Sequence, residues 1–196
     1  NTLAHIRPDG QIAATYDKHH LVPSGEYMPL GNLFSRWGIY GLAARDGYGF
    51  ASGPGPELFE IPGIGSVQAL ICYEGIFAHE VARGLERPRL ITSHTNDAWF
   101  GQWGGPAQHL AQAKARAIEQ GLPVARSANT GISAIIDARG RVVTLLALGE
   151  TGHVDAPLPV ALPPTVYSRW GDIPYGLLFV LGLFAHLLTS RRVVKD

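Results

Sequence analysis

Leu70-Ile71-Cys72-Tyr73-Glu74-Gly75 decides the fold, because here an apolar strand gives way to a predicted helix with the chain's one cysteine at the junction. A cysteine at such a turn is held out of the sheet. The first backbone N–H groups of the helix then favour its thiolate and can stabilise an oxyanion. A lone cysteine is, however, more commonly a buried and inert side chain. Position alone therefore makes Cys72 a candidate nucleophile and leaves the inert alternative open.

Short apolar runs on both sides of this junction predict a mixed α/β domain. Pro8-Asp9-Gly10 and Arg139-Gly140 indicate hairpin turns. Residues 41–66 are rich in Gly, Pro and small side chains, so we expect a functional loop or lid there. Strands alternating with helices suggest layered packing. The elements expected are strands over 3–6, 12–16, 67–71, 90–92, 123–126, 132–136 and 142–148, and helices over 76–85 and 107–120.

Residues 173–189 differ from everything before them because they are almost uninterruptedly apolar. A helix that spans a bilayer needs roughly 17–25 such residues. Aromatic side chains precede the run and a basic cluster follows it, which predicts a cytoplasmic C-terminus. A buried core helix is the alternative, favoured by His186 and the short length. We therefore predict a catalytic domain over 1–166, a transmembrane helix over 173–189 and a basic cytoplasmic tail over 190–196. Trp170 and Tyr175 lie at the front of this helix, and Arg191, Arg192 and Lys195 lie behind it.

The composition argues against several classes of function. The formal net charge is +0, which gives no electrostatic case for nucleic-acid binding. A single cysteine allows neither an intrachain disulfide nor a cysteine-based zinc site, and the eight histidines form no H-E-x-x-H pattern. No metal or other cofactor is therefore expected. Charged residues make up only 16% of the chain, which suggests a membrane segment or an extensive apolar surface.

Three further segments carry candidate functional residues. The first, 16–27, reads Tyr-Asp-Lys-His-His-Leu-Val-Pro-Ser-Gly-Glu-Tyr. In it, Lys18 could lower the pKa of a nearby thiol and neutralise an oxyanion, and Glu26 could orient that lysine or shuttle a proton. A solvated turn with ordinary surface charges is the alternative.

The other two segments are equally ambiguous. Thr-Asn-Asp-Ala-Trp-Phe-Gly at 95–101 offers Trp99 and Phe100 as a pocket wall, or else an Asx-type turn with an aromatic plug. In the segment at 126–131, Arg126 could pair with a structural carboxylate, for example Glu119.

Taken together, these segments resemble the nitrilase superfamily and, within it, the apolipoprotein N-acyltransferase family. The order and spacing of five motifs make the resemblance specific, and it extends over residues 1–192. The trailing apolar segment distinguishes the chain from soluble nitrilases. The motifs that carry the resemblance are residues 16–26, 71–74, 95–101, 105–109 and 126–133.

The resemblance implies an αββα sandwich with a Glu-Lys-Cys catalytic triad. Lys18 takes the lysine position and Cys72 that of the nucleophile. Glu26 matches a second functional glutamate of the family, and Tyr73 and Glu74 match residues required beside the cysteine.

Two features depart from that pattern. The family's general-base glutamate normally lies upstream of the lysine motif, and no glutamate occurs between Asn1 and Lys18. The chain by itself is therefore expected to be inactive. Ser24 also stands where the family usually has phenylalanine, which removes apolar bulk close to Glu26.

The implied reaction transfers a fatty acyl chain from a phospholipid, through a thioester on Cys72, to the N-terminal diacylglyceryl-cysteine of an apolipoprotein. Lys18 and the Tyr73 backbone N–H would stabilise the oxyanion, while Trp99 and Phe100 would line the lipid entrance. The expected partners are the phospholipid donor, the lipoprotein acceptor and the bilayer. The expected location is the bacterial inner membrane, with the catalytic domain on its periplasmic side. A nitrilase-type amidase acting on small amides and an inactive fragment are the alternatives.

Overall fold

The computed structural model describes residues 1–39, 49–82 and 86–193, with side chains in the last helix described up to Leu188. Its helices are α1 (Gly31–Phe34), α2 (Gly105–Gln120), α3 (Val166–Trp170) and α4 (Ile173–Val193), and its 3₁₀ turns are η1 (Ser35–Trp37), η2 (Cys72–Ile76) and η3 (Asp97–Phe100). Its strands are β1 (Thr2–Ile6), β2 (Ile12–Asp17), β3 (Leu58–Ile61), β4 (Gly65–Ile71), β5 (Leu90–Asn96), β6 (Val124–Asn129), β7 (Ser133–Ile136) and β8 (Val142–Leu146).

Strands β3 to β8 form one mixed sheet in chain order, which confirms the predicted α/β class. The three central strands, β4, β5 and β6, run parallel, while β3, β7 and β8 pair antiparallel. Parallel pairing brings the carboxyl ends of β4, β5 and β6 to the same edge of the sheet. In open α/β sheets this edge is where ligands bind, so it is the first place to look for a site.

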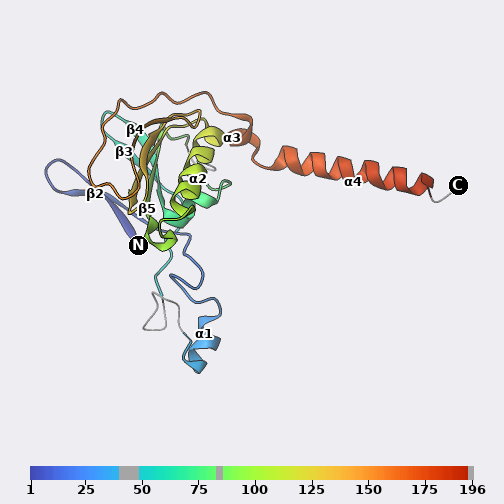
Figure 1. The fold of residues 1–196 in the computed structure, drawn as a ribbon, viewed down its shortest axis with the longest axis horizontal. Coiled ribbons are helices and arrows are strands. Elements are labelled where there is room, and N and C mark those ends of the chain that lie inside the picture. The colour runs from blue at the N-terminus through green and yellow to red at the C-terminus, as the bar shows by residue number, and fades with distance from the viewer. Residues whose placement is uncertain (40–48, 83–85, 194–196) are drawn as a thin grey trace.

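The two faces of this sheet bury different layers, because successive side chains of a strand point to opposite sides. On β4, Leu70 packs in the cluster that contains Ala113 and Ala117 of α2. The neighbouring Ala69 packs instead with Tyr16 of the β1–β2 hairpin and Phe59. Figure 1 shows the resulting order of α2, six-stranded sheet and two-stranded hairpin. The expected αββα sandwich is thus represented by a helix–sheet–sheet order, and the described residues supply no helical layer outside the hairpin.

Helix α2 forms where the Ala-rich segment predicted a helix, and local signals set both of its ends. Pro106 occupies its first turn, where a missing N–H costs nothing. Gly121 ends it in the left-handed conformation that glycine tolerates, at φ 63. Its buried side chains recur every three or four residues, as one helical face requires, and they are Pro106, His109, Ala113, Ala117 and Gln120.

The helix predicted over 76–85 is wrong. After η2 the chain continues as turns, and residues 83–85 lie outside the described residues. Gln68 of β4 explains the difference: its amide oxygen accepts the Ala82 N–H at 2.7 Å, and its amide nitrogen donates to the Glu80 carbonyl at 3.4 Å. A buried side chain thus satisfies backbone groups that a helix would satisfy internally.

The irregular stretch predicted over 41–66 is also partly wrong, because β3 forms inside it and pairs with β4. The part of that prediction at 41–48 lies outside the described residues.

At the C-terminal end, the chain returns to α2 before it leaves the domain. One guanidinium nitrogen of Arg87 donates to the carbonyls of Gln120, Gly121 and Leu162, which fixes this return. Helix α4 then projects away from the domain (Figure 1), with exposed apolar side chains such as Phe179 and Phe184.

The helix predicted over 173–189 therefore exists, but the buried core helix offered as an alternative is wrong. The predicted transmembrane span is not supported either. Within the described part of the chain, no helix combines the length and the apolar content needed to cross a membrane.

Candidate active site

Cys72 lies at the carboxyl end of β4, as the first residue of the turn η2. Its side chain is half-buried, and its backbone has φ 52, in the left-handed region. That conformation costs a residue other than glycine roughly 1–2 kcal/mol, so the surroundings must hold it in place. The predicted end of the strand at Cys72 is confirmed, but a 3₁₀ turn follows it in place of the predicted helix. The backbone strain marks Cys72 as a candidate functional position.

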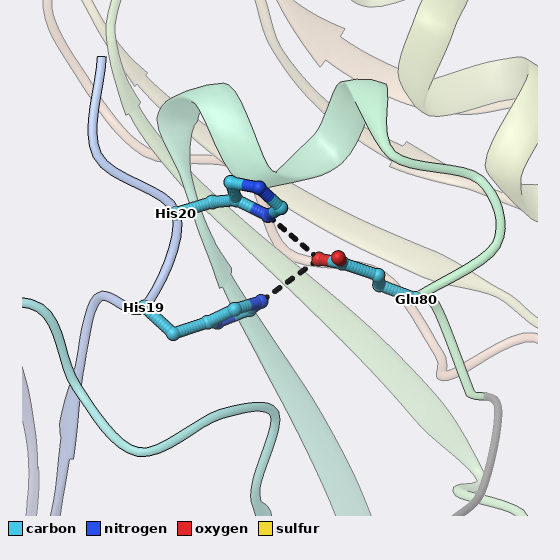
Figure 2. Close-up of side chains that lie close together, drawn as sticks. All are labelled: His19, His20 and Glu80. Atoms are coloured by element: carbon cyan, nitrogen blue, oxygen red, sulfur yellow. Dashed lines mark hydrogen bonds and ion pairs between the residues drawn. The ribbon is translucent and has the colours of Figure 1, made fainter. Parts of the chain in front are cut away.

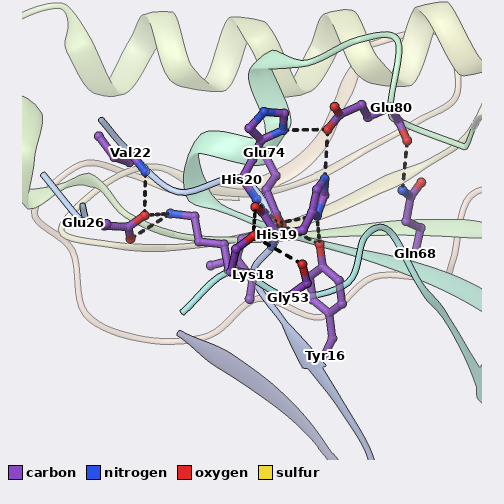
Figure 3. A network of polar contacts seen from close by, with 12 residues as sticks. Tyr16, Lys18, His19, His20, Val22, Glu26, Gly53, Gln68, Glu74 and Glu80 are labelled. Carbon is purple, nitrogen blue, oxygen red and sulfur yellow. Dashed lines mark hydrogen bonds and ion pairs between the residues drawn. The ribbon is translucent and has the colours of Figure 1, made fainter. Parts of the chain in front are cut away.

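Glu74 holds this turn from the hairpin side. Its Oε2 accepts the Ile71 N–H at 2.7 Å, and its Oε1 accepts the Tyr16 hydroxyl and the His19 N–H, each at 2.8 Å. Burial and the Glu74 carboxylate both raise the pKa of Tyr16, so the phenol keeps its proton. Figure 3 shows Glu74 among these groups. Glu74 is only 1% exposed, and its bonds to Tyr16 and to Ile71 join β2 to the turn that carries Cys72.

His109 holds the same turn from the side of α2. Its Nδ1 lies 2.8 Å from Asp97 Oδ1, and the imidazole also hydrogen-bonds to the backbone of Cys72. Burial lowers the pKa of His109, and the charge of Arg126 lowers it further against the opposing effect of Asp97. His109 is therefore the neutral imidazole at neutral pH, and it links the cysteine turn to the end of β5.

Asp97, the partner of His109, is itself held by two hydrogen-bond donors. The Arg126 guanidinium donates to its Oδ2 at 2.6 Å, and the Thr95 hydroxyl donates to its Oδ1 at 3.0 Å. Burial lowers the pKa of Arg126, while the neighbouring Asp97 and Cys72 oppose that shift. A thiolate at Cys72 would therefore interact with a buried guanidinium.

The pairing of Arg126 with Glu119, offered from the sequence, is wrong. Arg126 on β6 reaches Asp97, which follows the neighbouring strand β5. Glu119 lies near the opposite end of α2 from His109 and pairs with Arg116 on the same helix, at 2.8 Å.

Lys18 and Glu26 form a second ion pair, within the loop that follows β2. The Lys18 ammonium lies 2.8 and 2.7 Å from the two Glu26 oxygens and is 1% exposed (Figure 3). Glu26 also accepts the Val22 N–H at 2.8 Å and a bond from the Asn1 side-chain amide. A carboxylate with this many donors is fixed in place, so it orients the lysine, as one of its two predicted roles requires. Ser24 is exposed in the same turn, with φ 62.

The aromatic residues singled out in the sequence surround the same sheet edge. Trp99 and Phe100 belong to η3 at the carboxyl end of β5, and they are 66% and 45% exposed. Asn96 Oδ1 accepts the Ala98 N–H, so the predicted Asx-type turn is present, although its aromatic side chains stay open to solvent. Tyr73 is half-buried and meets Phe77 edge-on, with ring centroids 5.1 Å apart.

Comparison with known proteins agrees with the fold described above. The family model described as carbon-nitrogen hydrolase matches residues 1–162. The chain belongs to the carbon-nitrogen hydrolase family. Two proteins of known structure share its fold at low sequence identity, and they support the fold alone. They are a mutant of the amidase from Nesterenkonia sp. AN1 (TM-score 0.52, 21% identity, 75% of this chain and 51% of that chain) and a CN-hydrolase superfamily protein from Xanthomonas campestris (TM-score 0.53, 23% identity, 77% and 54%).

Curated relatives of this carbon-nitrogen hydrolase are much more similar in sequence. The apolipoprotein N-acyltransferase of Bradyrhizobium diazoefficiens is 50% identical over 195 residues, which are 100% of this chain and 36% of the relative. That of Rhodopseudomonas palustris is 47% identical over 191 residues, or 97% and 35%. The chain thus spans about a third of the length of these relatives.

The sequence analysis of this carbon-nitrogen hydrolase missed one cluster, formed by His19, His20 and Glu80 (Figure 2). Glu80 Oε2 lies 2.9 Å from His19 Nε2 and 2.8 Å from His20 Nδ1. Burial would raise the pKa of Glu80, but its hydrogen bonds with both imidazoles outweigh burial and lower it. The histidine pair was visible beside Lys18, but Glu80 lay within a predicted helix, so nothing in the sequence placed it there.

Proposed function

We propose that the protein transfers an acyl chain from a phospholipid to the N-terminal diacylglyceryl-cysteine of apolipoproteins, with Cys72 as the acyl carrier. The observation that carries the proposal is the strained backbone of Cys72, which Glu74 and His109 support from opposite faces of the sheet. The extended similarity to N-acyltransferases supplies the substrate class.

In the first step, the Cys72 thiolate attacks the ester carbonyl of the phospholipid. The C–O bond breaks, the lysophospholipid leaves as an alcohol after it takes up a proton, and a thioester remains on Cys72. In the second step, the α-amine of the diacylglyceryl-cysteine attacks the thioester and loses a proton. The C–S bond breaks, an amide forms and the thiolate returns, so the scheme is ping-pong.

Lys18 and Tyr73 would act on the charge that develops in both steps. A buried ammonium held by Glu26 has little freedom, so it can face an oxyanion without reorganising. The Tyr73 backbone N–H would be the second donor. Placing Lys18 opposite Cys72 is part of the proposal, and it is supported by the bonds of Glu74 to both the strand before Lys18 and the strand before Cys72.

A lipid substrate also accounts for the apolar surface of the protein. We propose that α4 contacts a bilayer, because its apolar side chains are exposed and the helix projects away from the domain (Figure 1). The exposed Trp99 and Phe100 would lie at the lipid entrance. The inner membrane and a periplasmic catalytic domain complete this proposal.

An amidase acting on small amides is the second candidate. Its support is the fold shared with the Nesterenkonia amidase, a mutant of which carries the acetamide moiety of fluoroacetamide on its active-site cysteine. A small water-soluble amide, however, gives no reason for the exposed apolar helix.

Acyl-enzyme trapping separates the two candidates. The full-length protein in its native membranes is incubated with a phospholipid that carries a labelled acyl chain. Protein-bound label is then released with neutral hydroxylamine, which cleaves thioesters. We expect label on the unaltered protein and on His153→Gln, a change at an exposed position, and none on Cys72→Ala. Label retained by a folded Cys72→Ala protein, or acylation by acetamide but not by phospholipid, would contradict the proposal.

A further inference from the structure

The close polar contacts around His19, beside the candidate active site, outnumber the protons that could form hydrogen bonds in them. Tyr16 Oη, His19 Nδ1 and Glu74 Oε1 lie within 2.7–2.8 Å of one another. The phenol has one proton, which it donates to Glu74, so the second proton of this triangle must be on His19 Nδ1. In a neutral imidazole, Nε2 then carries a bare lone pair.

That lone pair faces a carboxylate. Glu80 Oε2 lies 2.9 Å from His19 Nε2, and His20 Nδ1 approaches the same oxygen at 2.8 Å (Figure 2). Two acceptors at this distance repel each other unless a positive charge lies between them. A cation between these two groups, either an additional proton or a metal ion, would remove the repulsion.

We propose that His19, His20 and Glu80 form a binding site for a divalent transition metal, with Zn²⁺ the best match to two imidazoles and one carboxylate. One donor atom from each residue lies within 4.8 Å of the others. Zinc holds such donors at about 2.0–2.2 Å, so its tetrahedral ligands lie roughly 3.3 Å apart. Glu80 Oε2 already lies 2.9 and 2.8 Å from the two imidazole nitrogens, so each of these two spacings differs from that of a zinc site by only about 0.5 Å.

Groups around the ligands hold them as metal ligands are commonly held. His19 Nδ1 bonds to the buried Glu74 carboxylate, and a ligating histidine usually has this kind of partner on its other nitrogen. The His20 ring stacks on Phe77, with centroids 3.8 Å apart and planes 12° apart. His79 Nε2 lies 3.6 Å from the other oxygen of Glu80, so either His79 or water can complete the coordination.

A metal here would fix the position of the candidate catalytic lysine. His19 and His20 directly follow Lys18, and Glu80 lies on the segment that leaves the cysteine turn. An ion bound to all three would join these segments in addition to the Glu74 brace. Because the ligands come together only in the folded chain, binding would raise the stability of the protein.

Metal titration tests the site on the intact protein, purified in mild detergent and freed of metal with a chelator. We expect one Co²⁺ per chain, with the visible absorption of a four- or five-coordinate ion that Zn²⁺ abolishes, and a higher melting temperature with Zn²⁺. His20→Ala and Glu80→Gln should weaken Zn²⁺ binding at least about tenfold. His153→Gln removes an exposed histidine elsewhere and should leave binding unchanged.

Three results would overturn the assignment. The first is a metal-free protein that binds no more Co²⁺ than the His20→Ala, Glu80→Gln double variant. The second is unchanged Zn²⁺ affinity in single variants whose circular dichroism shows them to be folded. The third is a ¹⁵N spectrum in which both His19 nitrogens remain protonated in excess Zn²⁺, because a proton would then occupy the metal position. None of these measurements depends on acyl transfer, so the site and the proposed function can fail separately.

Discussion

Replacing Glu74 by glutamine should strongly destabilise the protein, although the two side chains have almost the same size. A glutamine has one acceptor oxygen and an NH₂ group that only donates. Glu74 uses both oxygens as acceptors, with Ile71 N–H on one and the Tyr16 hydroxyl and His19 N–H on the other. In either orientation, the amide NH₂ must face a donor.

The cost can be worked from these contacts. A hydrogen bond to a charged group contributes about 1.5–3 kcal/mol, and a buried donor left without a partner costs about 1–3 kcal/mol. The total is roughly 2.5–6 kcal/mol, and water cannot relieve it at a side chain that is 1% exposed. For a chain of this size, that loss lowers the melting temperature by roughly 5–20 °C.

Thermal and urea unfolding, followed by far-ultraviolet circular dichroism, measures this loss. The matched control is Glu150→Gln, because Glu150 is an exposed carboxylate that accepts one backbone N–H, from Ala147 at 3.0 Å. It should change the free energy of unfolding by less than about 0.5 kcal/mol. A Glu74→Gln protein as stable as the control would show that Glu74 does not brace the turn, and the account of Cys72 given above would be wrong.

Two further predictions concern the support from the α2 side. In Gly131→Ala, the new methyl group would lie 2.3 Å from an oxygen of the buried Asp97, so overpacking should lower the free energy of unfolding by about 1–3 kcal/mol. Urea unfolding measures this loss. The control is Gly152→Ala, whose new methyl group has its nearest contact at 3.6 Å and should cost far less. His109 has its pKa lowered by burial and by Arg126, so the unfolded chain binds its proton more readily. The contribution of neutral His109 to stability is therefore complete above about pH 6.5 and is lost as the pH falls below that value. In His109→Gln, the melting temperature should depend less on pH between pH 7 and 5. A slope equal to that of the unaltered protein would refute this prediction.

Local sequence signals were enough to predict most strands and the one long helix of the domain. The hairpin at residues 2–17 and helix α2 formed as expected, because turn residues, apolar periodicity and helix formers act over a few positions. The prediction over 76–85 failed because Gln68, distant in sequence, satisfies the backbone there. Apolar spacing alone cannot reveal such a partner.

The sequence alone could name candidate residues for the site, but it could not predict their contacts. Cys72, Lys18 and Glu26 were selected from the motifs, and the ion pair of Lys18 with Glu26 is present. The pairing of Arg126 with Asp97 depends on the register of β5 against β6, which no local pattern specifies. The cluster that includes Glu80 depends in the same way on where an irregular segment returns to the sheet.

The contacts that hold Cys72 also indicate which packing steps must precede formation of the site. The left-handed backbone of this residue is unfavourable by itself, and its two supports come from different layers, Glu74 bonding to the hairpin side and His109 reaching from α2. Neither layer alone holds the turn. Cys72 therefore reaches its position only when both layers have docked on the sheet. If the proposed acylation of Cys72 takes place, a change that loosens either docking surface should reduce it before it unfolds the strands beneath.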